Sequence, residues 1–101
     1  MSDDNVRAMA KGYWITCYRL MPDEVTLAEY ARIAGPAIES HGGRFVARGN
    51  PAKTYEVGMN QRLVIIEFEN VDKAISAYES PEYQAALALL KNLAERDVRI
   101  I

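Results

Sequence analysis

The chain of 101 residues is 50% hydrophobic and 26% charged, and its formal net charge at pH 7 is -2. This length predicts one domain, near the small end of the range in which a single hydrophobic core suffices. The slight acidic excess argues against binding to nucleic-acid phosphates, and no apolar run is long enough to span a bilayer. We therefore expect a soluble globular protein that binds neither nucleic acid nor a membrane.

The beginning of the chain and its single cysteine predict the compartment. Residues 1–10 are polar and acidic where a secretory signal would be basic and then apolar, so we interpret them as a flexible N-terminal tail. Cys17 cannot form an internal disulfide and lies in an apolar run, where a reduced, buried thiol is expected. These features favour a cytoplasmic protein with one domain over residues 11–101.

The first predicted elements are a strand and a helix. Residues 11–20 are rich in β-branched and aromatic side chains, which predicts a strand. From Thr26 onward, apolar residues recur at three- and four-residue spacing, which indicates one face of a helix. Thr26 is the expected N-terminal cap of this helix, and Gly42 with Gly43 is its expected end.

The second half of the chain predicts three strands and two helical pieces. Strands are expected at residues 44–50 and 62–69, joined by a long hairpin loop that contains Pro, Gly and Asn. Asn70 is the expected cap of the next helix, and Ser80, followed by proline and an acid, is the expected cap of the last one. Residues 97–101 predict the fourth strand.

This order is the βαββαβ pattern of the α+β, ferredoxin-like fold, a four-stranded antiparallel sheet with both helices on one face. A simple hairpin register places Arg44 opposite Glu67 and Arg48 opposite Leu63. Alternation assigns these side chains to the open face: Arg44, Val46, Arg48, Leu63, Ile65 and Glu67, with Trp14, Thr16 and Tyr18 from the first strand. Such a face is too apolar to be left in water, which predicts a second subunit that closes over it around a polar cavity.

Five sequence blocks resemble one known family. The blocks are KGYWI, HGGRFVARG, RLVIIEFEN, AYESPEYQAALAL and ERDVRII, and they resemble the domain-of-unknown-function 1330 family of the dimeric α/β-barrel superfamily. The resemblance extends from Met9 to Ile101 and implies a homodimer in which two sheets pack face to face, with a cavity in each subunit. Superfamily relatives include cofactor-independent monooxygenases, lactone isomerases, haem enzymes and ligand-binding regulators, so the fold leaves the function open.

The resemblance also implies a set of polar site positions. They are Arg48, Arg62, Glu67, Tyr83 and Asp97. Members of the family often carry arginine where this chain has Leu90, which implies a different ligand, or none, if that arginine lines the site.

His41 and Glu67 are the candidate proton-transfer residues. The pKa of histidine suits a general base, and its ring suits a haem ligand, whereas its position favours a helix-terminal histidine that contacts the last carbonyls. Glu67 would act as a base if burial raised its pKa, but pairing with Arg44 would lower that pKa. One histidine and one cysteine cannot form a metal cluster, so neither a metal nor another cofactor is expected.

The remaining candidates would bind a ligand. Arg48, held by its neighbours in a partly dry cavity, would bind a carboxylate or enolate oxygen, and the alternative is a subunit contact. Trp14 and Tyr18 are either a stacking wall for a planar ligand or interface anchors. Tyr83 either packs between helix and sheet or donates its hydroxyl at the cavity mouth.

Three functions are compatible with these residues. The first is an enzyme that acts on a small oxygenated or aromatic metabolite without a cofactor. The second is a non-catalytic dimeric module that binds a small ligand or another protein. The third is suggested by the RNA-recognition fold, which shares this topology but needs aromatic residues on its central strands and a basic surface.

Overall fold

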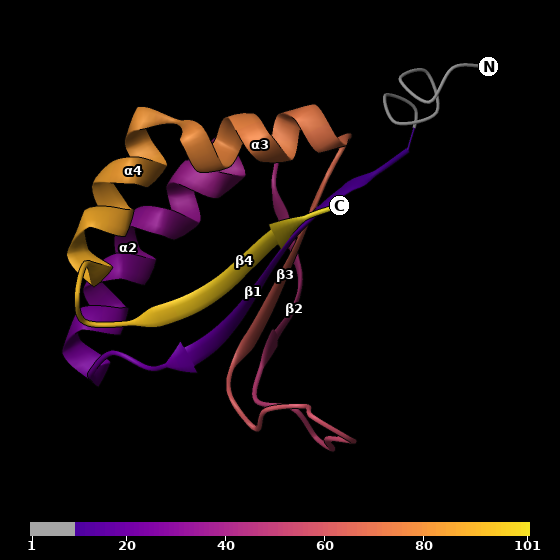
Figure 1. Cartoon of the computed structure of the whole chain (residues 1–101). Coiled ribbons are helices and arrows are strands. Elements are labelled where there is room, and N and C mark those ends of the chain that lie inside the picture. The colour runs from indigo at the N-terminus through magenta and orange to yellow at the C-terminus, as the bar shows by residue number, and fades with distance from the viewer. Residues whose placement is uncertain (1–9) are drawn as a thin grey trace.

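The computed structural model describes residues 10–101, so residues 1–9 of the predicted N-terminal tail lie outside the described residues. The elements follow the predicted order (Figure 1). They are β1 (Gly12–Leu20), α2 (Glu24–Ser40), β2 (Arg44–Gly49), β3 (Leu63–Phe68), α3 (Val71–Glu79), α4 (Pro81–Leu87), the 3-10 helix η1 (Ala88–Leu90) and β4 (Glu95–Ile100). The fold is therefore α+β and ferredoxin-like, as the sequence predicted.

The sheet has the strand order β2-β3-β1-β4, and every neighbouring pair is antiparallel. All helices lie on one face of the sheet, and the loop between β2 and β3 extends beyond its lower end (Figure 1). Edge strand β4 lies next to the turn that follows α4, so this edge and the end of the helical layer come together. The opposite face of the sheet carries no element of the described chain.

Local signals explain where the helices begin. Helix α2 is capped by Asp23, whose carboxylate accepts hydrogen bonds from the Thr26 backbone N–H at 2.8 Å and from its hydroxyl at 2.9 Å. The prediction of Thr26 as the cap was wrong by one turn, because an aspartate three residues earlier accepts from its N–H. The other two caps are confirmed: Asn70 accepts from Lys73 N–H at 2.9 Å, and Ser80 accepts from Tyr83 N–H at 3.2 Å.

The glycine pair ends α2, as predicted. Gly42 has φ 88°, a left-handed conformation that glycine adopts without steric cost. A Cβ on Gly43 would lie 2.5 Å from Ile38 Cγ2 and 2.8 Å from Phe68 Cζ, so only glycine lets the chain pass this close to the core. The pair thus serves the helix end and the entry into β2.

Strand β1 faces the opposite way from the prediction. Trp14 and Tyr18 were assigned to the open face, but they are 0% and 3% exposed and lie under the helices, with Thr16 between them. Trp14 stands beside Ile66 in the register and packs in the core. Both alternating sets of this strand are largely apolar, so hydrophobicity alone did not distinguish the buried set.

A β-bulge corrects the predicted face of Arg48. Arg44 lies opposite Glu67 as predicted, but the register shifts between Phe45 and Ala47, and Arg48 then lies opposite Val64. One extra residue reverses the alternation, so Arg44 and Arg48 do not share a face. The guanidinium of Arg48 lies 4.6 Å above the centre of the Phe45 ring, at the exposed edge of the sheet.

Candidate functional site

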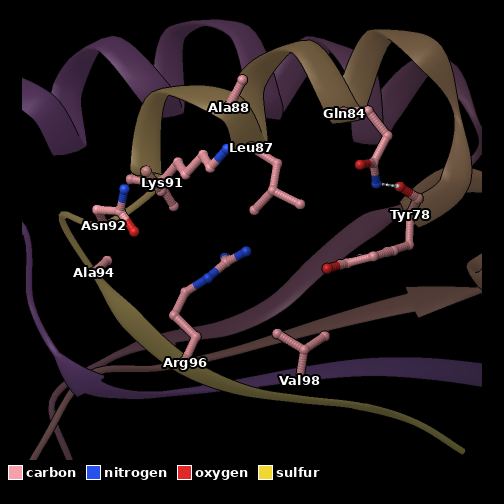
Figure 2. Close-up of a pocket in the computed structure, with 10 residues that line it drawn as sticks. Tyr78, Gln84, Leu87, Ala88, Lys91, Asn92, Ala94, Arg96 and Val98 are labelled. Carbon is pink, nitrogen blue, oxygen red and sulfur yellow. Dashed lines mark hydrogen bonds between the residues drawn. The ribbon is translucent and has the colours of Figure 1, made fainter.

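A cavity of about 450 Å³ lies between the helical layer and edge strand β4 (Figure 2). It is lined by Tyr78, Gln84, Leu87, Ala88, Leu90, Lys91, Asn92, Ala94, Arg96 and Val98. One end of the cavity is formed where η1 ends and Asn92, with φ 65°, reverses the chain into β4. The same turn brings the last helical residues close to the first residues of the strand.

Arg96 is the central charged group of this region. Its guanidinium donates a hydrogen bond to the Tyr30 hydroxyl at 3.2 Å and another to the Tyr83 hydroxyl at 2.9 Å. The two phenol oxygens are themselves 2.7 Å apart, and the guanidinium also lies 5.7 Å from the centre of the Tyr18 ring. We call Arg96, Tyr18, Tyr30 and Tyr83 the tyrosine-arginine cluster.

Four elements build the tyrosine-arginine cluster. Tyr18 comes from β1, Tyr30 from α2, Tyr83 from the first turn of α4, and Arg96 from β4. The three phenols are 8% exposed or less, so they hold the guanidinium in a largely dry setting. Within residues 10–101, no acidic side chain forms an ion pair with Arg96.

Burial and the contacts within the cluster together set the protonation states of Tyr83 and Arg96. Burial raises the pKa of the Tyr83 phenol, contact with Tyr30 raises it further, and Arg96 acts in the opposite direction. Burial lowers the pKa of Arg96, whereas the oxygens of Tyr30 and Tyr83 raise it, and the net shift is upward. Tyr83 is therefore a neutral phenol and Arg96 a cation throughout the physiological pH range.

The cluster has more hydrogen-bond donors than acceptors. The guanidinium has five N–H donors, and two of its hydrogen bonds go to the phenols. Only one of the two phenolic hydrogens can be used between Tyr30 and Tyr83. In Figure 2 the Arg96 guanidinium and the Tyr78 hydroxyl point toward each other inside the cavity, with Leu87 above them and Val98 below. The site therefore has N–H donors left for an acceptor atom of a bound molecule.

Three of the predicted ligand-binding residues belong to this region. Tyr18 and Tyr83 are members of the tyrosine-arginine cluster, and Trp14 lies behind it. The Trp14 ring packs edge-on against Tyr83 at 4.6 Å and against Tyr78 at 5.1 Å, and its N–H donates to the Thr16 hydroxyl at 2.9 Å. Trp14 thus supports the cavity wall without lining it.

The predicted acidic residues lie on the open face instead. Glu67 accepts hydrogen bonds from Arg44 at 3.2 Å and from the Tyr13 hydroxyl at 3.1 Å, and these contacts lower its pKa. Asp97 accepts from Arg99 at 3.0 Å and lies 3.5 Å from Arg19, which likewise lower its pKa. Both groups are ionised and paired, which makes Glu67 a poor base near neutral pH.

His41 lies at the end of α2, away from the cavity. Its Nδ1 is 2.8 Å from the Ala37 carbonyl oxygen, which confirms the predicted contact with the last carbonyls, and its Nε2 is 3.9 Å from a Glu82 carboxylate oxygen. It lines a separate surface depression beside α3. Arg62 is half-buried, and its carbonyl accepts from the backbone N–H of Tyr18 at 3.0 Å. The structure therefore does not bring His41, Glu67 or Asp97 together with Tyr83.

Sequence reasoning missed Arg96, the residue just before Asp97. The signal was present in the alternation of the last strand, because Val98 and Ile100 are apolar and share the alternation of Arg96. An arginine in phase with buried aliphatic residues indicates a cation on the covered face. The family resemblance pointed to Asp97, the neighbour that faces the other way.

A second cavity, of about 620 Å³, lies where the β2–β3 loop folds beside the open face. Its charged lining includes Arg19 and Arg99, which both pair with Asp97. No group of His, Cys, Asp and Glu within the described residues is arranged to hold a metal ion. None of the helices in residues 10–101 is long and apolar enough to cross a membrane.

The comparisons with known proteins agree with this fold. A family model described as a domain of unknown function, DUF1330, matches residues 11–101, so the chain belongs to this family. The sequence matches none of the curated proteins with which it was compared. The predicted family is therefore confirmed, and its description assigns no activity.

Solved structures share the fold at low sequence identity. A protein of unknown function from Rhodopseudomonas palustris has a TM-score of 0.67 and 19% identity, over 100% of this chain and 90% of that one. SnoaB, a cofactor-independent oxygenase from Streptomyces nogalater, has a TM-score of 0.64 and 11% identity, over 90% of each chain. A dimeric ferredoxin-like protein from Thermobifida fusca has a TM-score of 0.63 and 16% identity, over 90% of this chain and 89% of that one.

Proposed function

We propose that this protein binds a small organic molecule in the cavity between the helical layer and β4. The observation that carries the proposal is a cavity of about 450 Å³ into which Arg96 points without an acidic partner in residues 10–101. Small-molecule sites commonly occupy about 300–1,000 Å³ and combine an apolar lining with a few polar groups. Leu87, Leu90 and Val98 supply the apolar lining here.

Filling the cavity tests this proposal. Leu87 points into it, so Leu87→Trp should occupy the space and abolish ligand binding. Leu89→Trp is the matched control, because Leu89 lies two residues away and is 38% exposed. Native mass spectrometry of gently purified wild-type protein and both variants would report any bound small molecule. A molecule retained by wild type and by L89W but lost from L87W supports the cavity, and equal retention by all three proteins contradicts it.

A second candidate function is cofactor-independent oxygenation, favoured by the fold shared with SnoaB. No lining residue of the cavity, within the described chain, is a carboxylate or a histidine, so no ordinary general base is present in its wall. A substrate that ionises by itself, such as an acidic phenol or enol, would need only Arg96 to stabilise its anion before reaction with molecular oxygen. Oxygen uptake by chelator-treated protein with such a substrate, lost in L87W but not in L89W, would favour this function.

We also propose that two copies of the chain form a homodimer through the open face of the sheet. Ile15, Leu63 and Ile65 lie on this face and are only partly buried in the single subunit. The related fold from Thermobifida fusca is described as dimeric. Ile65→Lys should convert a dimer into a monomer, whereas Ala85→Lys on the exposed side of α4 should not. Sedimentation equilibrium distinguishes these outcomes, and a monomeric wild type would contradict the dimer.

A further inference from the structure

We infer that the molecule held in this cavity is an organic carboxylate: a single carboxylate group bound by Arg96, attached to an apolar body of one or two rings. The inference rests on the proposed function and adds the chemical class of the ligand. It depends on three features of the site: the unmatched charge, the composition of the wall, and the helix end that borders it.

The unmatched charge comes first. Desolvating a guanidinium is costly, and proteins usually offset that cost with a carboxylate. Arg96 is only partly exposed, and its side-chain partners are phenols: Tyr30 and Tyr83 accept its hydrogen bonds, and Tyr18 also interacts with it. Phenols satisfy N–H donors but do not neutralise the charge. An anion in the cavity would supply the missing counter-charge.

The wall of the cavity adds a second cation and no acid. Lys91 lines the site together with Arg96, and none of the described lining residues is Asp or Glu. The cavity is therefore locally positive, although the chain as a whole has a net charge of -2. A cationic ligand would be repelled, and a neutral ligand would leave the charge of Arg96 unmatched.

The helix end limits the charge of the ligand. Leu87 is the last residue of α4, and Ala88 and Leu90 belong to η1, so the helical residues at this end of the cavity lie where the partial charge of the backbone is negative. Multiply charged phosphates usually bind at helix N-termini, where several backbone N–H groups are free. The first residues of α4, Pro81 and Glu82, do not line this cavity. A planar guanidinium matches a carboxylate through two parallel hydrogen bonds. These conditions favour a carboxylate over a phosphate.

The apolar lining selects the rest of the ligand. Leu87 and Val98 face each other across the cavity, and the ring of Tyr78 forms one side (Figure 2). Flat aromatic bodies pack well between aliphatic side chains and a tyrosine ring. Naphthalene-2-carboxylate is therefore a suitable probe, because it combines one carboxylate with a rigid apolar body.

The experiment compares three probes that differ only in their polar group: naphthalene-2-carboxylate, naphthalene-2-carboxamide and 2-naphthylmethylamine. Calorimetric titration of the wild-type protein should show the carboxylate bound about ten-fold or more tightly than the amide, and the amine not bound. The carboxylate should also lose affinity as salt is raised, because part of its binding is electrostatic. This wild-type comparison does not depend on any variant folding correctly.

Variants identify the residue responsible. Arg96→Gln should bring the carboxylate and amide affinities together, and Arg96→Lys should restore part of the difference. Arg32→Gln is the control, because Arg32 lies exposed on α2 and pairs with Glu29 at 3.1 Å. It should leave the carboxylate preference unchanged.

The outcomes separate the two proposals. If the amide binds as tightly as the carboxylate, and L87W abolishes that binding, the ligand class is wrong and the cavity proposal stands. If Arg96→Gln folds and keeps the carboxylate preference, Arg96 is not the anchor and the inference fails. If none of the probes binds at millimolar concentration, the carboxylate inference is overturned, and native mass spectrometry of L87W still decides the cavity proposal.

Discussion

Two faces of the same sheet use arginine in different ways. On the open face, Arg44 pairs with Glu67, and Arg19 and Arg99 pair with Asp97. On the covered face, the tyrosine-arginine cluster surrounds Arg96 with phenols and includes no acid. Each of these open-face arginines therefore contacts a carboxylate, whereas Arg96 on the covered face contacts none within the described residues.

This difference separates a structural role from a binding role. A paired arginine lowers the pKa of its carboxylate partner and has little remaining charge to offer a ligand, which is the situation of Arg44 with Glu67. An arginine held by neutral phenols keeps its charge available. Glu67 and Asp97, the two predicted site residues that do lie on the open face, are paired in this way, which favours the covered face as the place where a ligand binds.

The largest expected difference between the faces is in stability. Trp14 is 0% exposed and packs on Tyr78, Tyr83 and Phe68, so Trp14→Ala should lower the free energy of unfolding by about 3–5 kcal/mol. Tyr13, the residue just before Trp14, faces the open side and is only half-buried. Tyr13→Ala is the matched control and should cost clearly less in urea unfolding. Equal losses would mean that the open face is buried as deeply as the core, as in a very tight dimer.

Removing one hydroxyl group from the tyrosine-arginine cluster should have a smaller effect on the free energy of unfolding. Tyr83→Phe removes the acceptor of the 2.9 Å hydrogen bond from Arg96 and the partner of the Tyr30 hydroxyl. Leaving a buried charged donor without its acceptor should cost about 1–3 kcal/mol of unfolding free energy. Tyr55→Phe is the control, because Tyr55 is 74% exposed on the β2–β3 loop. If Y83F is as stable as wild type, the phenols do not compensate the buried guanidinium.

The element order and most of the caps could be predicted because their signals are local. Asn70 and Ser80 accept hydrogen bonds from N–H groups three residues further along, so a short stretch of sequence contains the whole interaction. The choice of Asp23 over Thr26 was missed, because both residues are good caps and the chain alone does not say which one stands outside the first turn.

The site could be predicted only in part, because it depends on which side of each strand is covered. Tyr83 and Tyr18 were predicted to be site residues and lie in the tyrosine-arginine cluster, but Tyr18 was placed on the wrong face, and Arg48 was misplaced by a bulge of one residue. The link between Arg96 and Tyr30 spans 66 positions and exists only after the sheet and helices pack. No local pattern identifies such a pair.

The smallest expected effect is the response of the open face to acid. Arg44 and Tyr13 lower the pKa of Glu67, and Arg99 and Arg19 lower that of Asp97, so both carboxylates are ionised more readily in the folded than in the unfolded chain. Their contribution to stability is therefore present above the ordinary carboxyl pKa of about 4 and is lost as the pH falls through the lowered values.

Urea unfolding at pH 7 and at pH 3 would measure this effect. Glu67→Gln and Asp97→Asn should each be slightly less stable than wild type at pH 7, and the difference should shrink at pH 3, where wild type has lost part of the same contribution. Glu39→Gln, on the exposed side of α2, should show no such convergence. The pKa values of Tyr83 and Arg96 are both raised from ordinary values that already lie far above this range, so Tyr83→Phe should keep its full deficit at both pH values, which separates the two faces by their response to acid alone.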